Sequence, residues 1–374
     1  MNAAVLPAPA TMPSPIAPPR PTSLRIAMVA PPYFDVPPKA YGGVEVIVAD
    51  LVDALVDRGH YVVLIGAGRN GTRAQEYIAT FDEPRPAQLG EPLPEVLHAA
   101  RVGQLLCDVG VDLVHDHTLA GPLLAAGRLV PTLVTAHGPV SGDAGCYYRA
   151  LRGSISLVGI SDAQRRAAPD LPWVATVYNA VRVESFPFRR DKDDFALFLG
   201  RFHPDKAPHL AIDAARAAGL PIVLAGKCSE PIEHEYFARM VGPRLGSDVT
   251  VFGLADAQAK RDLLSRARCL LFPICWEEPF GVVMIEAMAC GTPIVALRRG
   301  SVPEVIEHGR TGIVVDDAEA LPDAIEQARR VDPVECRRVA KVCFDVPTMA
   351  SRYEAVYRQL VTDDTFYGPV SVAS

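Results

Sequence analysis

The sequence lacks the features of small disulfide-bonded, zinc-binding and membrane-spanning proteins. Its eight cysteines are scattered over 374 residues and form no Cys-x-x-Cys pair, so neither a disulfide framework nor a zinc ribbon is indicated. No segment approaches the roughly 18 to 20 apolar residues that cross a bilayer. We therefore expect a soluble, cytoplasmic protein without stable membrane insertion.

Positive charge is also scarce. The formal net charge is −7, and residues 24–180 carry 12 basic and 16 acidic side chains. A nucleic-acid partner would call for clustered Lys and Arg, and an anionic membrane surface attracts basic segments. Neither partner is expected.

The first 23 residues lack the basic start and apolar core of a secretory signal. They consist mainly of Pro, Ala, Ser and Thr, with Arg20 as the one charged side chain. We interpret residues 1–23 as a disordered tail.

What the sequence does contain is a regular alternation of short apolar runs with helical patterns, typical of parallel sheets with crossover helices. The polar stretch 182–194 interrupts this alternation and predicts a linker between domains 24–181 and 195–345. The fold class is therefore α/β, with two Rossmann-like doubly wound parallel-sheet domains facing an interdomain cleft. The predicted strands are 24–30, 61–67, 112–117, 132–138, 156–161 and 174–180, then 195–200, 221–226, 249–253, 269–274, 293–297 and 311–315.

The stretch GAGRNG at 66–71 matches the G-x-G-x-x-G pattern of a dinucleotide-binding turn. That pattern has its chemical meaning when the glycines end a strand and open a helix. Here it follows the second strand, and residues 72–86 supply barely two helical turns before proline. We interpret it as a glycine-rich surface loop, which makes a dehydrogenase the weakest reading.

The segment 273–297 contains the largest group of candidate functional residues. Pro279 predicts a helix that begins there and runs to about Cys290, because proline favours the first helical position. The helix N-terminus offers a seat for phosphate, and Gly281 permits close approach. Glu278 and Glu286 are eight positions apart, roughly on one side, and suit neutral hydroxyls of a sugar or ribose better than phosphate.

Two further turns carry candidate phosphate-binding groups. Arg201 and Lys206 follow the first strand of the second domain, where two cations can clamp a diphosphate. Gly42 and Gly43 precede the first helix of the chain, so backbone N–H groups there can meet the same ligand. Each feature alone also fits an ordinary surface loop.

Histidines gather near the ends of two strands of the first domain. His115 and His117 flank Asp116 and project to one face of a strand, an arrangement that could ligate a metal. No further ligand cluster is apparent, so we favour residues that line the acceptor side, with no metal. His137 precedes a glycine at the carboxyl end of a strand, where open α/β sheets place ligands.

Together these motifs resemble the retaining glycosyltransferases of family 4, which have the GT-B fold. The resemblance covers nearly all of the chain after the tail: the early GG turn, AHG at 136–138, GR with a lysine five residues on, EEPFGVVMIEAMACGTP, and PEVIEHGRTG at 303–312. It implies a nucleotide-sugar donor, front-face transfer with retained anomeric configuration, no cofactor and no metal-held diphosphate.

The resemblance also implies roles for individual residues. Arg201 and Lys206 would bind the donor diphosphate and Glu286 its ribose. Glu278, with the backbone of Phe280 and Gly281, would hold the donor sugar. His137 would lie beside the anomeric carbon. A helix at 346–363 would cross back to the first domain.

Two departures from the family pattern concern glycines. The usual GG-x-PE reads GSVPE at 300–304, and the usual NG before the linker is Asn179-Ala180. An added Cβ at Ser301 or Ala180 could shift a loop or alter hinge freedom.

The hypothesis is a hexosyltransferase that acts on a nucleotide diphosphate sugar, UDP-sugar first and GDP-mannose next. Its hydroxyl acceptor is expected to be a small soluble molecule or glycan, because the first domain is acidic. A loop such as 140–148 would contact the acceptor. The alternatives are an epimerase or hydrolase of the same fold, and a non-catalytic sugar-nucleotide binding protein.

Overall fold

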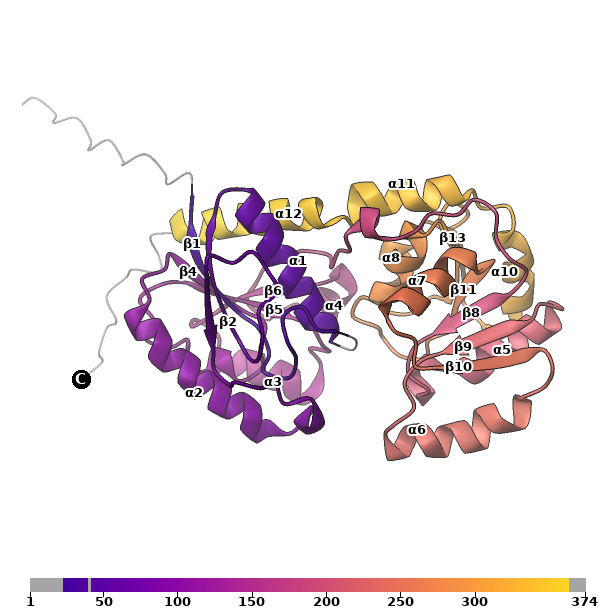
Figure 1. Cartoon of the computed structure of the whole chain (residues 1–374), viewed down its shortest axis with the longest axis horizontal. Helices are drawn as coiled ribbons and strands as arrows, with labels where there is room; N and C mark the ends of the chain where they lie inside the picture. The colour runs from indigo at the N-terminus through magenta and orange to yellow at the C-terminus, as the bar shows by residue number, and fades with distance from the viewer. Residues whose placement is uncertain (1–22, 40–41, 363–374) are drawn as a thin grey trace, which may run out of the picture.

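The structure is a computed structural model that describes residues 23–39 and 42–362. The tail predicted at 1–23 lies outside this range except for Ser23. Within the described ranges, no helix combines the length and apolar character needed to cross a bilayer. Two sheets, each flanked by helices, lie side by side in the molecule (Figure 1).

The first domain contains a seven-stranded sheet in the order β3-β2-β1-β4-β5-β6-β7, with all pairs parallel. Its strands are β1 Arg25–Val29, β2 Tyr61–Gly66, β3 Glu76–Ala79, β4 Leu113–Asp116, β5 Thr132–Ala136, β6 Ser156–Gly159 and β7 Trp173–Thr176. Its α-helices are α1 Gly43–Asp57, α2 Pro92–Asp108, α3 Gly142–Ala150 and α4 Asp162–Ala167.

The second domain contains a six-stranded parallel sheet in the order β10-β9-β8-β11-β12-β13. Its strands are β8 Ala196–Leu199, β9 Ile222–Ala225, β10 Val249–Gly253, β11 Cys269–Phe272, β12 Ile294–Leu297 and β13 Gly312–Val315. Its helices are α5 Pro208–Ala217, α6 Pro231–Tyr236 continued by a π-helical turn Phe237–Val241, α7 Ala257–Arg266, α8 Val282–Ala289, α9 Val302–Val305, α10 Leu321–Ala328 and α11 Pro333–Cys343.

Short 3-10 helices join these elements. They are Pro86–Gln88, Gly121–Leu124, Val183–Ser185, Pro204–Lys206, Gly242–Arg244 and Ala318–Ala320.

Each strand predicted from the sequence is present, but β3 was not predicted. The helical turns expected after Gly71 are wrong, because residues 76–79 instead pair with β2 as the edge of the sheet. β3 has four residues, EYIA, and begins with a charged side chain, so it lacks the longer apolar run that identified the other strands. Since no helix opens after the GAGRNG loop, the loop has no helix N-terminus to offer a dinucleotide.

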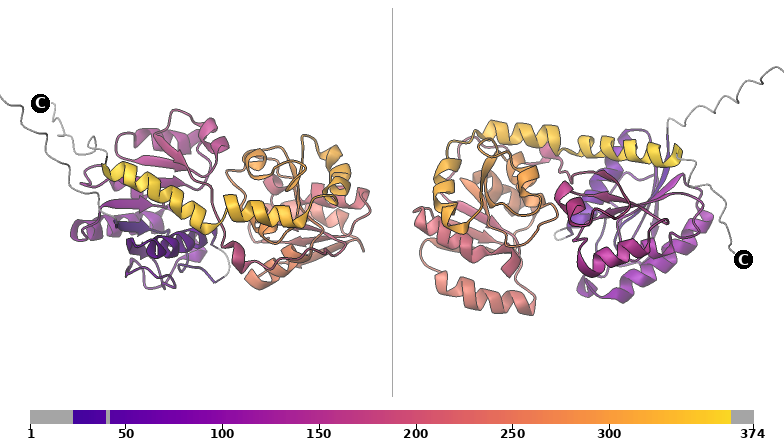
Figure 2. Two further views of the ribbon diagram at one scale, coloured as in Figure 1. Left: turned by 90° about the horizontal axis from the view of Figure 1, so that it is seen from above. Right: turned by 180° about the vertical axis from the view of Figure 1, so that it is seen from behind.

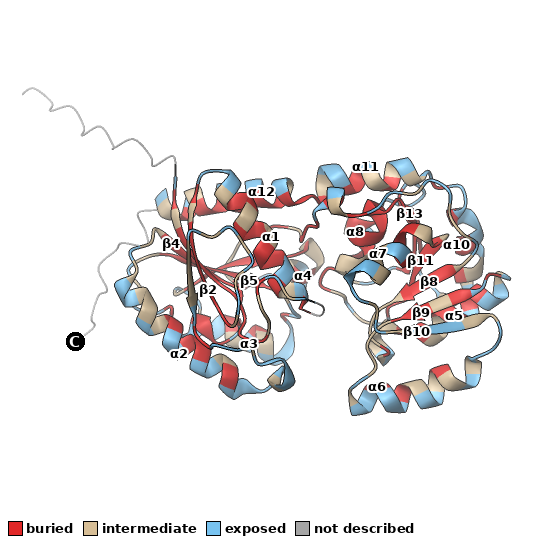
Figure 3. Cartoon of the chain, viewed as in Figure 1, coloured by how far each residue is buried: buried red, intermediate tan, exposed pale blue. Residues whose placement is uncertain are grey.

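The central strands are buried on both faces because alternate side chains enter different cores. Ile26 and Met28 pack into the cluster that contains α1, whereas Ala27 and Val29 pack with Val102 of α2 on the opposite face. Figure 3 shows the central strands of both sheets in red, between partly exposed helices. This two-sided burial explains why these strands read as uninterrupted apolar runs.

The chain passes between the domains twice, and the two passages lie together. Val181 donates its N–H to Phe344 O at 3.0 Å, and Val183 donates to the carboxylate of Asp345 at 3.1 Å. After the second passage, α12 (Val346–Thr362) packs against α1 of the first domain. Figure 2 shows α12 over the first domain and α11 over the second.

The order of the strands fixes where ligands can meet loops from neighbouring strands. In the first sheet the order reverses between β1 and β4, and in the second sheet between β8 and β11. Loops at such a point leave the carboxyl edge in opposite directions and open a crevice there. The predicted residues Gly42, Arg201, Lys206 and Glu278 all belong to loops that follow these strands.

Candidate active site

The loops that follow β8 and β11 meet at the switch point of the second sheet. The ammonium group of Lys206 forms an ion pair with the carboxylate of Glu278, which also accepts a 3.0 Å hydrogen bond from the indole N–H of Trp276. The same ammonium lies 5.0 Å from the centre of the Trp276 ring. The backbone adds a link, because Cys275 N donates to Asp205 O at 2.8 Å. Two predicted residues are thus in direct contact.

Arg201 lies in the same loop but points to different partners. Its guanidinium is 3.5 Å from Glu233 and 3.7 Å from Glu230, both at the start of α6. Glu233 is fully buried and also caps the N–H groups of Ser229 and Glu230. Arg201 therefore has a fixed acidic anchor beside the switch point, and its side chain is 35 % exposed.

The prediction that a helix begins at Pro279 is wrong. α8 begins at Val282, because Phe280 is buried at 1 % exposure and Gly281 adopts a left-handed φ of 77° that ends the loop. A Cβ at Gly281 would lie 3.0 Å from the ring of Phe272. The predicted end is correct, since Cys290 caps the helix. Residues 278–281 are consequently an irregular loop whose backbone groups lie outside the helical ladder.

A second loop holds this one in place. Ser301 donates its hydroxyl to Phe280 O at 2.7 Å and its N–H to Glu278 O at 3.0 Å. Gly300 donates its N–H to the carboxylate of Glu277 at 2.7 Å. Ser301 has a helical backbone, with φ at −76°, so this departure from the usual glycine causes no strain. The serine adds a bond to the Phe280–Gly281 loop.

The other glycine departure is equally well accommodated. Ala180 is 1 % exposed and packs in the core cluster of the first domain. Its φ is not in the left-handed region. The extra Cβ at this position therefore contributes to packing.

Glu278 lies just outside α8, which contains Glu286. Glu286 lies in the second turn of α8 and forms an ion pair with Lys260 of α7. The residue is 8 % exposed. Each carboxylate thus has its own lysine partner.

In the first domain, His137 and His117 form a pair at the carboxyl ends of β5 and β4. His137 Nε2 lies 2.9 Å from His117 Nδ1, and the rings stack with centres 5.2 Å apart. Burial lowers the pKa of His137 to about 4. Burial, and then the neighbouring His115 and His137, lower the pKa of His117 well below its usual value. Both rings are therefore neutral at pH 7, so His137 can exchange hydrogen bonds with hydroxyls but carries no charge.

His115 belongs to a different network. It contacts Tyr357 Oη at 2.7 Å and Thr135 Oγ1 at 2.8 Å, and Tyr353 Oη lies 2.9 Å from the same threonine hydroxyl. Both tyrosines come from α12, so the helix that crosses back is bonded to the strands that carry the histidines. No group of three or more His, Cys, Asp or Glu side chains in the described part of the chain is placed to hold a metal ion.

Gly42 and Gly43 form the start of α1 as predicted, with Gly42 as the cap. Figure 1 shows this end of α1 on the side of its domain that faces the second domain. Glu45 in the first turn is 4 % exposed, and burial raises its pKa to about 7. A partly protonated carboxyl group repels an approaching phosphate less than an ionised one.

Sequence reasoning missed a contact between the domains. Glu304 of the second domain accepts hydrogen bonds from the backbone N–H groups of Asp162, at 2.7 Å, and Ala163 in α4 of the first domain. The signal was present in the PEVIEHGRTG motif, but its partner lies 142 residues away in the chain. No local pattern identifies such a partner.

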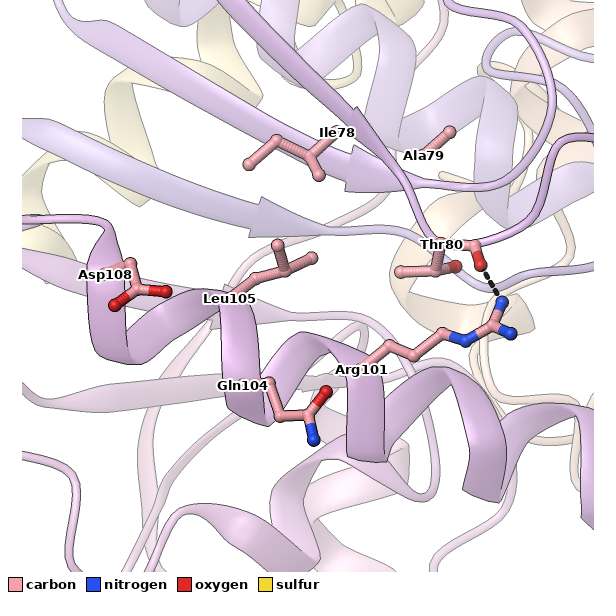
Figure 4. A pocket seen from close by; sticks show the side chains of 7 residues that line it. All are labelled: Ile78, Ala79, Thr80, Arg101, Gln104, Leu105 and Asp108. Atoms are coloured by element: carbon pink, nitrogen blue, oxygen red, sulfur yellow. Dashed lines mark hydrogen bonds between the residues drawn. The ribbon is translucent and has the colours of Figure 1, made fainter.

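One pocket, of about 260 Å³, lies between β3 and α2 (Figure 4). Thr80, Arg101 and Asp108 are among its lining residues. Arg101 is engaged there, because it donates to the carbonyl of Thr80 and covers the ring of Phe81. This pocket contains none of the predicted site residues and lies beside the edge strand, so we do not assign the chemistry to it.

Two family comparisons cover most of the chain. A sequence model described as "Glycosyltransferase Family 4" matches residues 41–185, and one described as "Glycosyl transferases group 1" matches residues 183–338. The second match contains Arg201, Lys206, Glu278 and Glu286. The first contains Gly42 and His137.

Curated relatives align over nearly their full length. The phosphatidyl-myo-inositol mannosyltransferase of Mycobacterium leprae is 27% identical over 94% of this chain and 100% of its own. The alpha-maltose-1-phosphate synthase of Mycolicibacterium smegmatis is 28% identical over 82% of this chain and 89% of its own.

Solved structures share the architecture. AviGT4, a glycosyltransferase involved in avilamycin A biosynthesis, is 27% identical and superposes with a TM-score of 0.70 over 91% of this chain and 98% of its own. Anabaena Alr3699/HepE, solved in complex with UDP-glucose, is 18% identical and has a TM-score of 0.68 over 90% of this chain and 100% of its own. The predicted GT-B fold is confirmed.

Proposed function

This chain belongs to glycosyltransferase family 4, and we propose that it is a retaining hexosyltransferase that uses a nucleotide diphosphate sugar without a metal ion or cofactor. The contact between Lys206 and Glu278 carries this proposal. It joins a cation suited to phosphate and a carboxylate suited to sugar hydroxyls at the switch point of the second sheet.

The site offers separate groups for each part of the donor. Lys206 and Arg201 would hold the diphosphate, and Glu286 would accept hydrogen bonds from the ribose hydroxyls. Glu278 and the backbone of Phe280 and Gly281 would hold the sugar. Both cations lie in one loop and keep part of their side chains exposed, so a diphosphate can reach them without unfolding the loop.

The proposed chemistry breaks the bond between the anomeric carbon and the diphosphate oxygen while the acceptor oxygen attacks from the same face. Negative charge grows on the departing diphosphate, and Lys206 and Arg201 stabilise it. A diphosphate oxygen takes the proton of the acceptor hydroxyl, so no protein base is required. His137, neutral because of its low pKa, donates or accepts a hydrogen bond at the sugar.

The donor base, the sugar and the acceptor form the finer part of the proposal. We favour a UDP-sugar, then GDP-mannose, and a small soluble molecule or glycan as acceptor. The curated relatives include a mannosyltransferase, a maltose-1-phosphate synthase and a glycogen synthase, which differ in what they make. A mass-spectrometric screen of UDP-, GDP- and ADP-sugars against acceptor pools identifies the pair, and product analysis without acceptor separates transfer from hydrolysis or epimerisation.

Isothermal titration with UDP, GDP and ADP tests the binding step. We expect wild type to bind at least one of them. Lys206→Met removes a charge-assisted hydrogen bond worth about 1.5–3 kcal/mol, so kinetics of this variant should show kcat/KM lowered by roughly 10- to 150-fold. Arg338→Ala is the control, since Arg338 pairs only locally with Glu335 on α11. Failure of all three nucleotides to bind wild type at millimolar concentration would refute the proposal.

A further inference from the structure

The four-residue helix α9 has an anchoring residue at each end. At its start, Ser301 donates its hydroxyl to Phe280 O at 2.7 Å, in the loop proposed to hold the donor sugar. Near its other end, Glu304 reaches the first domain. Because α9 is short and lies between these contacts, a displacement of one anchor displaces the other.

The carboxylate of Glu304 is saturated with donors from the first domain. Its Oε2 accepts from Asp162 N at 2.7 Å and from Tyr178 Oη at 3.3 Å. Its Oε1 accepts from Ala163 N at 2.5 Å and from the guanidinium of Arg166 at 2.9 Å. The side chain is 12 % exposed. An anion is favourable at this place, because the first N–H groups of α4 have no partner within the helix.

α4 in turn holds the segment that carries His137. The amide nitrogen of Gln164 donates to Ala136 O at 2.8 Å and to Gly138 O at 2.7 Å, the two carbonyls on either side of His137. Its amide oxygen accepts from Ile160 N at 2.8 Å. Gln164 is 4 % exposed and both its donor hydrogens and its oxygen are used.

These contacts form one continuous connection from the loop proposed to hold the sugar to His137 in the other domain. It runs through the carbonyl of Phe280, Ser301, Glu304, the start of α4, Gln164 and the backbone around His137. A second contact runs beside it, since the rings of Phe280 and Tyr178 lie 6.0 Å apart. The loop that would hold the donor sugar and the histidine that would face it thus belong to different domains but share a bonded support.

We propose that Glu304 is a positioning residue for glycosyl transfer, which through α4 and Gln164 fixes His137 relative to the loop at Phe280 and Gly281. This inference rests on the function proposed above. Neither Glu304 nor Gln164 contacts the reacting atoms. Their effect is expected on turnover, and the nucleotide affinity should depend on Lys206, Arg201 and Glu286.

Two isosteric substitutions test the connection. Glu304→Gln replaces a double acceptor by an amide whose NH₂ faces a backbone donor. Gln164→Glu turns a carboxylate oxygen toward the carbonyls of Ala136 and Gly138. Glu307→Gln is the matched control, because Glu307 is half-exposed and pairs with Arg310 within its own loop. The measurements are nucleoside diphosphate affinity, kcat and KM with the pair found by the screen, and hydrogen exchange of peptides over 133–140.

Each isosteric variant is expected to bind nucleoside diphosphate within twofold of wild type and to lose at least tenfold in kcat. The double variant should lose no more than about threefold beyond the worse single, because both changes break the same connection. Glu304→Gln should also speed exchange over 133–140, a segment that Glu304 does not touch. If each residue made a separate structural contribution, the two losses in kcat would multiply in the double variant, and the exchange rate over 133–140 would stay unchanged.

The proposal is overturned if folded Glu304→Gln keeps wild-type kcat, or if exchange over 133–140 is unaltered. Should Glu304→Gln not fold, Arg166→Ala serves instead: Arg166 is 67 % exposed and supports the same carboxylate. It should lower kcat two- to fivefold with unchanged nucleotide affinity, and wild-type kcat would again overturn the role. Failure of wild type to bind nucleotide refutes the proposed function itself. If wild type turns over and Glu304→Gln has the same kcat, only the positioning role is refuted.

Discussion

A single methyl group at Gly300 should displace the loop that we propose to hold the donor sugar. An ideal Cβ built on Gly300 lies 2.3 Å from Glu278 O and 2.5 Å from Glu278 N. Both are backbone atoms, so no side-chain rotation relieves the clash. Gly300 also has a φ of 51°, in the left-handed region where glycine is favoured. Gly300→Ala must therefore push the loop around Glu278 away from its present place.

The expected magnitude has two parts. The left-handed conformation costs an alanine about 1–2 kcal/mol, and overpacking against fixed neighbours costs about 1–3 kcal/mol. The loop can relieve the overpacking by moving, but this would misplace Glu278 and the backbone of Phe280 and Gly281, the groups that we propose to hold the donor sugar. A loss of about 3 kcal/mol of transition-state stabilisation corresponds to roughly 150-fold in kcat/KM.

Steady-state kinetics and thermal unfolding of Gly300→Ala measure this loss, with Gly309→Ala as the control. Gly309 has a comparable φ of 80°, but no atom of the described residues lies within 4 Å of its added Cβ. The control should lose stability from the backbone conformation alone and keep kcat/KM. If Gly300→Ala stays within threefold of wild type in kcat/KM, the loop does not depend on this close approach and the reasoning fails.

Two predictions concern stability. His98 is fully buried, and burial lowers its pKa to about 4. Between pH 6.5 and 4 the unfolded state therefore binds more protons than the folded state. The free energy of unfolding consequently falls as pH falls through this range. In urea titrations, the unfolding free energy lost between pH 7 and 5 should be about 2 kcal/mol smaller in His98→Gln than in wild type. An unaltered pH dependence would contradict the low pKa of His98. Tyr357→Phe removes a partner of buried His115 and should cost about 1–3 kcal/mol of unfolding free energy. Tyr353→Phe should cost less, because Thr135 keeps its bond to His115, and an equal or larger cost would argue against this network.

Much of the fold could be predicted because buried strands require apolar side chains, which are visible in the sequence. Parallel strands covered on both faces require continuous apolar runs, and every such run became a strand. β3 was missed because its short segment Glu76–Ala79 begins with a charged side chain, whereas the no less exposed edge strand β10, Val249–Gly253, is an apolar run. The sequence carries a half-buried pattern there that a short helix would also produce.

The site was predictable to the extent that its residues follow strand ends. Arg201, Lys206 and Glu278 could be placed at one edge because parallel strands end together. The start of α8 could not, because the rule for proline at the first helical position competes with the burial of Phe280 and the left-handed Gly281. The role of Glu304 was invisible because its partners are backbone N–H groups, which every residue except proline possesses.

Cationic and acidic side chains alternate through the proposed site. Lys206, Arg201 and Lys260 each contact a carboxylate, from Glu278, Glu233 and Glu286 respectively. Each carboxylate offsets the charge of its partner, which limits repulsion between the three cations. In the proposed function, the diphosphate takes over the role of counter-ion for Lys206, and Glu278 is then released to accept hydrogen bonds from the sugar. The same residues would thus stabilise the loops of the site and recognise the donor, by exchanging partners within a fixed backbone.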